Sequence, residues 1–516
     1  MSRRSLPLAI SALAAVPLFA QTAIPPNLQR ALNSITAANL KGDLSFLASD
    51  ALQGRFTPSP GLDVAAEFIA SQFRAAGLAP GGDHDYFQIA HMLDRRMGQV
   101  LSDMTLDAAG KSFQIPAASV NVSAASQAAK IDRVPLLAFA SRDPDLLKGA
   151  DLAGKAVLAP ALDWRKIPPN QLQSVFSKTR AFDAAVASSK AVLELLVTTG
   201  PLPPAQPSLV PAGEAATPQF PKLVVSSHQL HQWLEQPNGR GERTVSVEFS
   251  APEDRTVVVN NVVAILRGSD PTLRNTCVLL TAHYDHIGTK ETAGGAANPE
   301  ARQNSSDQIF NGANDDGSGT VSVIEIARAL ANLNPHPKRS IVFMTFFGEE
   351  RGELGSQYYG KHPIFPIAQT VADLNLEQVG RTDSTVGKQI DNASLTGYDY
   401  SDLTSFLERA GRETGIRLYM DKSASDAYFV RSDNAALAEQ GVPAHTLTVA
   451  FDYPDYHGVG DEWQKIDYDN MARVDRMVAL GLVDVANSPT APRWNAANPK
   501  TAPFREAQRK LQAQGQ

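Results

Sequence analysis

The chain has 516 residues, of which 43% are hydrophobic and 20% are charged, and its formal net charge is −7. This is the composition of a globular protein with a large core, and the length suits two or three domains. The acidic balance offers no basic surface for nucleic acid or an anionic membrane, so neither is expected as a partner.

The first twenty residues have the features of an export signal. Two arginines precede a short apolar run, Leu6–Phe19, and Ala20 is a small residue at a suitable cleavage point. The run contains two prolines and is shorter than a membrane-spanning helix. We therefore expect residues 1–20 to be a signal peptide and the mature protein to be periplasmic or secreted, with no membrane span after cleavage.

The next part of the chain begins as a helical domain and then changes character. Residues 61–78 place alanine, isoleucine and phenylalanine on one helical face, which predicts a packing helix. Residues 112–252 are rich in proline, alanine and serine and contain short strand-like runs such as VPLLAFA and KLVVSS. We predict that 112–252 form a separate, small, β-rich domain inserted into the first α/β unit.

Strands and helices alternate in the second half of the chain. Apolar runs predict strands at 258–268, 277–286, 341–348, 371–380 and 442–451, and amphipathic patterns predict helices at 318–333 and 471–486. This alternation predicts an α/β fold with a mostly parallel central sheet and helices on both faces. The only cysteine, Cys277, falls in a predicted strand, so it is expected in the core and no internal disulfide is possible.

The domain boundaries follow from these patterns. We assign 21–111 and 253–487 to one discontinuous domain that surrounds the insert. The last segment, 488–516, is rich in proline and alanine and is predicted to be a disordered tail.

Polar side chains follow the predicted strands at the points where the strands end. They are His283, Asp285 and His286 after one strand, Asp315 and Asp316 in a turn before a helix, Glu349 and Glu350, Glu377, and His457. In open α/β sheets, ligands bind beyond the carboxyl ends of the strands, so these groups are expected to converge. Converging carboxylates would repel one another without a cation. Imidazole and carboxylate without cysteine suit Zn²⁺, with Mn²⁺ or Co²⁺ as looser fits.

Several motifs resemble the M28 family of zinc peptidases. They are HYD (283–285), GANDDGSG (312–319), GEE (348–350), LNLEQVGR (374–381) and DYHGVGDEWQKID (455–467), supported by LASDALQGR (47–55) and RSDNAALAEQGVPA (431–444). The resemblance covers roughly 40–110 and 255–487 and implies the zinc-peptidase type of phosphorylase/hydrolase-like fold. Through DLAGKAVLA (151–159), the insert is similar to the protease-associated (PA) domain of many members.

The resemblance also implies two Zn²⁺ ions per chain. One would be held by His283, Asp315 and Glu377, and the other by Asp315, Glu350 and His457. Asp315 would bridge the two ions. Glu377 stands where many members carry aspartate, and its longer arm changes the geometry at that position.

Further roles are implied around the ions. Glu349 would be the general base, and Asp285 would orient His283 through the free ring N–H. Asp316 would be structural or would support the ligands. His286 has no matching ligand role and is expected in a loop or at the substrate's edge, and the remaining histidines, including His445, are expected at the surface or in loops.

The function expected from this resemblance is that of an exported metallo-aminopeptidase acting on peptides. The alternatives are a carboxypeptidase or a glutaminyl cyclase of the same fold, and a binding protein on a peptidase scaffold. Lost ligands would mark a binding scaffold, whereas every ligand position is filled here. A carboxypeptidase needs clustered arginines for the terminal carboxylate, but Arg351, Arg381 and Arg431 are dispersed in the sequence. The oligomeric state stays open.

Overall fold

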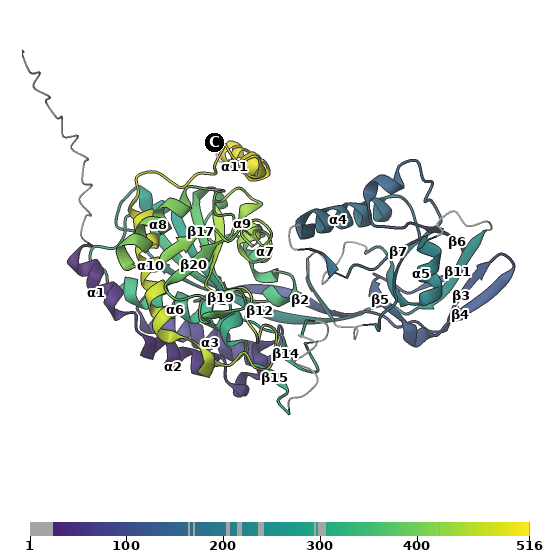
Figure 1. Cartoon of the computed structure of the whole chain (residues 1–516), viewed down its shortest axis with the longest axis horizontal. Helices are drawn as coiled ribbons and strands as arrows, with labels where there is room; N and C mark the ends of the chain where they lie inside the picture. The colour runs from purple at the N-terminus through teal and green to yellow at the C-terminus, as the bar shows by residue number, and fades with distance from the viewer. Residues whose placement is uncertain are drawn as a thin grey trace, which may run out of the picture.

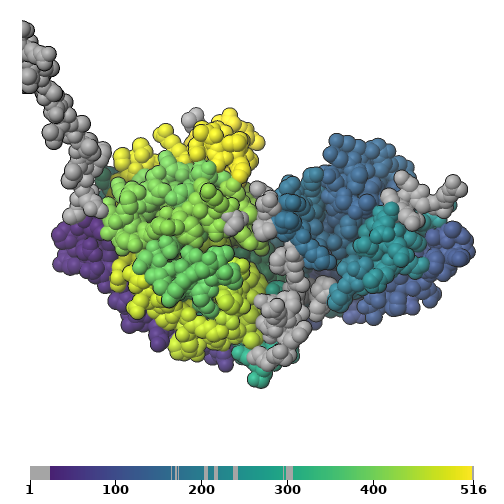
Figure 2. Space-filling model, viewed as in Figure 1, coloured from purple at the N-terminus to yellow at the C-terminus, as the bar shows by residue number. Residues whose placement is uncertain are grey.

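The structure is a computed structural model of the chain, and it has two lobes (Figure 1). It describes residues 24–163, 166–168, 171–202, 207–213, 219–235, 242–293, 296–297, 306–422 and 424–514. The predicted signal peptide, residues 1–20, lies outside the described residues. The larger lobe contains both ends of the described chain, and the middle of the chain forms the smaller lobe (Figure 2).

The larger lobe is built on a ten-stranded sheet. Its strands, in spatial order, are β21 (Arg417–Tyr419), β20 (Asn392–Leu395), β22 (Ala444–Thr448), β17 (Thr370–Leu376), β13 (Cys277–His283), β16 (Ser340–Phe346), β12 (Glu253–Leu266), β2 (Phe87–Arg96) and β9 (Ser208–Pro211), while β1 (Ala79–Pro80) pairs with β12. The central strands β22, β17, β13 and β16 are parallel, and the flanking pairs β12–β16, β2–β12 and β20–β22 are antiparallel. The α/β class is confirmed, with parallel pairing concentrated at the centre.

Two cores cover the two faces of this sheet. All seven residues of β13 and of β16 are buried, which explains why both strands are mostly apolar. On one face pack α1 (Pro26–Ser34), α2 (Ala37–Leu47), α3 (Pro60–Ala75), α6 (Gly319–Ala331), α8 (Leu403–Thr414) and α10 (Tyr468–Asn487). On the other face lie α7 (Leu354–Lys361), α9 (Asn434–Ala438) and α11 (Ala502–Gln514), over the core that contains the buried Cys277.

The prediction of a disordered tail after Asn487 is wrong. Trp494 and Phe504 are 5% and 6% exposed and belong to the second core, and Phe504 lies in α11. The Trp494 indole N–H donates to the carbonyl of Gly441 at 2.9 Å. Composition suggested disorder, but two large aromatic side chains bury enough apolar surface to order the segment.

The smaller lobe has its own eight-stranded sheet. In spatial order the strands are β4 (Lys111–Ile115), β3 (Met104–Ala108), β11 (Arg243–Phe249), β6 (Ala129–Ala138), β7 (Ala156–Pro160), β8 (Leu193–Thr198), β10 (Lys222–Ser226) and β5 (Val120–Ala124), with helices α4 (Leu172–Ser188) and α5 (His228–Glu235). The predicted start at residue 112 falls within β4. It must move to before Met104, because β3 joins β4 to β11.

A ribbon of β2 and β12, with β9 paired to Met92–Arg95 of β2, joins the lobes (Figure 1). β12 pairs with β16 only from Val262 to Leu266, whereas it pairs with β2 from Glu253 to Val262. The ribbon therefore runs past the carboxyl end of β16, and the smaller lobe lies on the side toward which the central strands end. Among the described residues, no helix is long and apolar enough to cross a membrane.

Candidate metal centre

The ends of the central strands bring the predicted residues to one edge of the sheet. His283 is the last residue of β13, and Glu377 directly follows β17. Glu349 and Glu350 follow β16 in a short turn that begins after Gly348, whose φ of 69° is a conformation that glycine adopts readily. Asp315 lies in the irregular turn that precedes α6.

Asp315 lies between two histidines. The His283 Nε2 is 3.4 Å from one carboxylate oxygen of Asp315, and the His457 Nε2 is 3.1 Å from the other. The same His457 nitrogen is 3.3 Å from Glu350, and Glu349 is 3.8 Å from His283 Nε2. A carboxylate with each oxygen directed to a different imidazole has the arrangement that a bridging ligand needs.

Glu377 completes the group at the end of β17. It is 7% exposed, and the Ser432 hydroxyl donates to its Oε1. Burial raises the pKa of Glu377 to about 7, while His283 acts in the opposite direction. The Glu377 carboxylate therefore interacts electrostatically with two other predicted ligands, His283 and Asp315.

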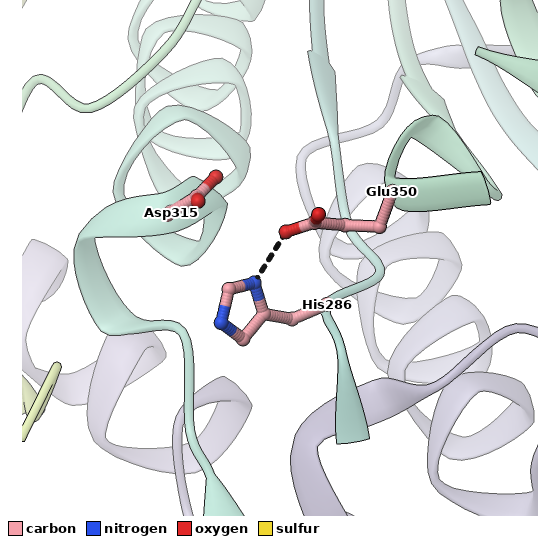
Figure 3. Close-up of side chains that lie close together, drawn as sticks. All are labelled: His286, Asp315 and Glu350. Atoms are coloured by element: carbon pink, nitrogen blue, oxygen red, sulfur yellow. Dashed lines mark ion pairs between the residues drawn. The ribbon is translucent and has the colours of Figure 1, made fainter. Parts of the chain in front are cut away.

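His286 lies in the loop after β13, as predicted, but it is not at an exposed edge of the site. It is fully buried, and its Nδ1 is 2.7 Å from Glu350 Oε1 (Figure 3). One ligand atom from each of His286, Asp315 and Glu350 lies within 4.8 Å of the others, so this trio could hold a cation. The burial depends on Gly312, where a Cβ would come within 2.4 Å of the His286 ring. The repeated histidine in HYDH was the only sequence signal.

Two further aspartates hold the loops that carry these groups. Asp285 lies 3.5 Å from His283 Nδ1 and accepts the backbone N–H of Glu349 at 3.1 Å. Asp316 accepts backbone N–H groups at the ends of β13 and β17 and at the start of α6, all within 3.3 Å. Asp316 thus joins three elements, while the neighbouring Asp315 faces the histidines.

A third aspartate was not singled out from the sequence. The Asp461 carboxylate accepts the backbone N–H groups of Asn314 and Asp315 at 3.0 and 3.1 Å, and it also accepts the Tyr453 hydroxyl at 2.9 Å. Asp461 lies four residues after His457, so the same loop supplies an imidazole and supports the turn that carries Asp315.

The electrostatics of the site favour positive charge. Burial alone would lower the pKa of His283, but Glu349, Asp285 and Asp315 raise it well above its usual value. The pKa of His457 is likewise raised, chiefly by Glu350, against the effect of burial. Buried imidazoles and carboxylates that together stabilise a cation fit a zinc site by their donor chemistry.

The carboxylates respond to this environment in opposite directions. Hydrogen bonds from His283 and His457 outweigh burial and hold the pKa of Asp315 well below its usual value. Burial and the neighbouring carboxylates raise the pKa of Glu349 well above its usual value. One acid is thus held as an anion, and the other favours holding a proton.

Residues 261–481 match the family model described as Peptidase family M28. A leucine aminopeptidase 1 from Fusarium vanettenii is 29% identical over 181 residues, which cover 33% of this chain and 45% of that protein. A probable zinc metalloprotease from Pyrenophora teres f. teres is 28% identical over 258 residues, covering 46% and 50%. The chain spans about half the length of these curated relatives.

A solved structure, the aminopeptidase from Aneurinibacillus sp. strain AM-1, resembles this chain over most of its length. The two share 19% sequence identity with a TM-score of 0.56, and the match covers 91% of this chain and 97% of that one. This likeness supports the fold described above.

Proposed function

We propose that the chain is a zinc-dependent aminopeptidase that removes N-terminal residues from peptides. The proposal starts from the match of residues 261–481 to the model of peptidase family M28. The observation that carries the proposal is Asp315 between His283 and His457, with Glu349 and Glu350 beside them. We also propose that the protein is exported, on the basis of residues 1–20.

The proposed site holds two Zn²⁺ ions. The ligands of one would be His283, Asp315 and Glu377, and those of the other Asp315, Glu350 and His457. Bound Zn²⁺ supplies Lewis acidity, which polarises a carbonyl and lowers the pKa of a water molecule. His286 contacts Glu350 and Asp285 contacts His283, so each supports one ligand in a fixed orientation.

Glu349 moves the proton in the proposed reaction. Its backbone N–H is held by Asp285, and its carboxylate lies beside His283 at the edge where the ligands meet. As general base it accepts a proton from the attacking water while a C–O bond forms at the peptide carbonyl. It then donates that proton to the leaving amine as the C–N bond breaks.

The contacts of the arginines favour recognition of the amino end. Arg381 is paired with Asp455 at 2.9 Å, Arg351 donates to the Thr57 carbonyl at 2.8 Å, and Arg431 lies over a tyrosine ring. A carboxypeptidase would direct such groups together at a terminal carboxylate. These three are instead engaged with separate partners.

Acidic groups near the site suit a substrate amine. Asp433 is fully buried, and burial raises its pKa to about 6. The negative charge of Asp433 raises the pKa of Glu349 and of Glu377. Negative charge beside the proposed metal site matches a free α-ammonium group better than a carboxylate.

Two experiments test the proposal. Hydrolysis of an aminoacyl anilide should disappear after dialysis against a strong chelator and return with Zn²⁺. Acetylating the N-terminus of a good peptide substrate should reduce kcat/KM by at least about a hundredfold, because the acidic groups lose their partner. Full activity in metal-free protein, checked by elemental analysis, would refute metal dependence. Cleavage that is unaffected by N-terminal acetylation but is abolished by C-terminal amidation would identify a carboxypeptidase.

A further inference from the structure

We propose that Arg55 is a positioning residue that holds together the two loops that carry the proposed metal ligands. The inference rests on the proposed function, because it concerns how that metal site is built. Arg55 lies more than 220 residues before the first of these ligands in the chain and is 1% exposed. In the sequence it appeared only as the last residue of LASDALQGR.

The Arg55 guanidinium donates to both loops at once. Its Nε donates to the Tyr284 carbonyl at 2.7 Å. Tyr284 lies between His283 and Asp285, at the start of the loop that follows β13. Its two terminal nitrogens donate to the carbonyls of Asn311 and Gly312 at 2.7 and 2.9 Å, just before the turn that carries Asp315.

Two more hydrogen bonds tie Arg55 to its surroundings. Nη1 also donates to the Leu47 carbonyl at 2.6 Å, at the end of α2. The backbone carbonyl of Arg55 accepts the N–H of His286 at 3.2 Å. The side chain therefore joins the loop after β13 to the turn that carries Asp315. The main chain of Arg55 holds His286, which contacts Glu350.

The four side-chain bonds described above all go to main-chain carbonyls, which are neutral acceptors. Burial lowers the pKa of Arg55 to about 10, so the group stays charged at neutral pH. Asp285, Asp461, Asp316 and Asp315 interact with this charge from the site behind it. A buried cation is costly unless it is compensated. Here it offsets the repulsion among carboxylates before any metal binds.

The backbone around Arg55 is shaped to deliver this side chain. Gln53, Gly54 and Arg55 all have left-handed φ values, of 49°, 67° and 47°. A Cβ at Gly54 would come within 2.3 Å of the Gly288 carbonyl oxygen and within 2.4 Å of that of Phe310. These two residues belong to the β14–β15 pair (Gly288–Thr289 with Ile309–Phe310), which adjoins both loops. The turn is thus packed directly against the support of the metal site.

The geometry distinguishes an arginine from a lysine at this position. Arg55→Lys keeps the charge, but a single ammonium cannot reach carbonyls on α2 and on both loops as the planar fork does. Residues that orient metal ligands typically change metal affinity 10–100-fold when they are replaced. We therefore expect Arg55→Lys to bind Zn²⁺ at least about tenfold more weakly than the unmodified protein.

The test measures Zn²⁺ affinity by competition with a chromophoric chelator, together with Tm of the metal-free and Zn²⁺-loaded protein. The matched control is Arg476→Lys, since Arg476 also donates to two main-chain carbonyls, those of Leu32 and Ile35, away from the site. Arg55→Lys should weaken Zn²⁺ binding and reduce the rise in Tm on adding Zn²⁺. Arg476→Lys should lower both Tm values equally and leave the affinity unchanged.

The outcomes separate this inference from the proposed function. An Arg55→Lys protein that folds and binds Zn²⁺ with unchanged affinity overturns the positioning role alone. An unmodified protein that binds no Zn²⁺ overturns the proposed function as well. If Arg55→Lys does not fold, Gly54→Ala gives the same readout, because its Cβ displaces the turn without altering the guanidinium. Reduced affinity in Gly54→Ala supports the inference, and unchanged affinity refutes it.

Discussion

Glu349 and Glu350 are neighbours in the chain but lie in different environments. Glu350 contacts His286 and His457, whose charge lowers its pKa to about 2 despite burial. Glu349 is 3.8 Å from His283, and burial raises its pKa. Glu350 is suited to bind a cation, and Glu349 is suited to accept and return a proton.

Substituting each glutamate should therefore have a different effect. Glu349→Gln should retain bound Zn²⁺ and lose at least about 100-fold in kcat, because only the base is removed. Glu350→Gln should lose affinity for one ion as well. Metal content and kcat measured on the same samples test this. Two variants that both keep their metal, with only Glu350→Gln inactive, would reverse the assigned roles.

His445 is buried inside β22, contrary to the prediction of a surface or loop position. Its Nε2 lies 2.7 Å from the Ser401 hydroxyl and its Nδ1 lies 2.8 Å from the Thr396 carbonyl. Burial lowers its pKa to about 4, against about 6.5 when unfolded. The stability that this neutral imidazole contributes is present above pH 6.5 and is lost as pH falls toward 4.

His445→Gln should remove this pH dependence. The free energy of unfolding of metal-free wild-type protein should fall by about 3 kcal/mol more than that of the variant between pH 7 and pH 4. Urea unfolding of both proteins across this range measures the difference, since other titrating groups are shared. Parallel curves for the two proteins would contradict the prediction.

Individual residues were predictable where the sequence places them at the ends of apolar strands. His283, Glu349 and Glu377 fall there because the strand pattern itself fixes the edge of the sheet. Arg55 and the burial of His286 were not predictable in this way. Both depend on contacts between loops that are distant in sequence, and local polarity alone suggests exposure.

At the scale of elements, the C-terminal segment closes the second core. Phe504 stacks on Trp494 with ring centroids 5.1 Å apart and meets the edge of Phe429 at 5.3 Å. Composition could not indicate this, because proline and alanine are abundant both in linkers and in segments anchored by a few aromatic residues. β12 also begins earlier than predicted, at Glu253 instead of residue 258, and its first residues pair only with β2.

Phe504→Ala should lower the free energy of unfolding by about 3 kcal/mol, because it leaves a cavity among buried aromatic rings. Urea unfolding measures the change. The matched control is Phe46→Ala on α2, where the side chain is 40% exposed and a smaller effect is expected. Equal effects at the two positions would show that the C-terminal segment does not pack as described.

At the scale of the whole molecule, the two lobes have separate hydrophobic cores. Two clusters of buried residues lie wholly between Met104 and Phe249, and the two clusters around the larger sheet contain no residue of that range except Leu209. The division into a discontinuous domain and an insert came from composition. The sequence could not give its boundary, because the connecting strands continue from one lobe into the other.

The smaller lobe should therefore fold alone. We expect residues 97–252, expressed by themselves, to show cooperative thermal unfolding by circular dichroism and dispersed amide resonances. Their native fold should match that of the lobe in the full chain, apart from β9, which loses its partner β2. A fragment with no cooperative transition would contradict an independent domain.

The ribbon has a consequence for how this architecture could vary. Arg96 and Glu253 are direct partners in it, and the segment between them, 97–252, forms the smaller lobe and the strand β9, which pairs with β2. A tight turn between these two strands would close them into a plain hairpin and preserve the register of every strand behind it. The smaller lobe can therefore be exchanged or removed at one junction, together with the edge strand β9, while the other strands of the larger sheet keep their alignment.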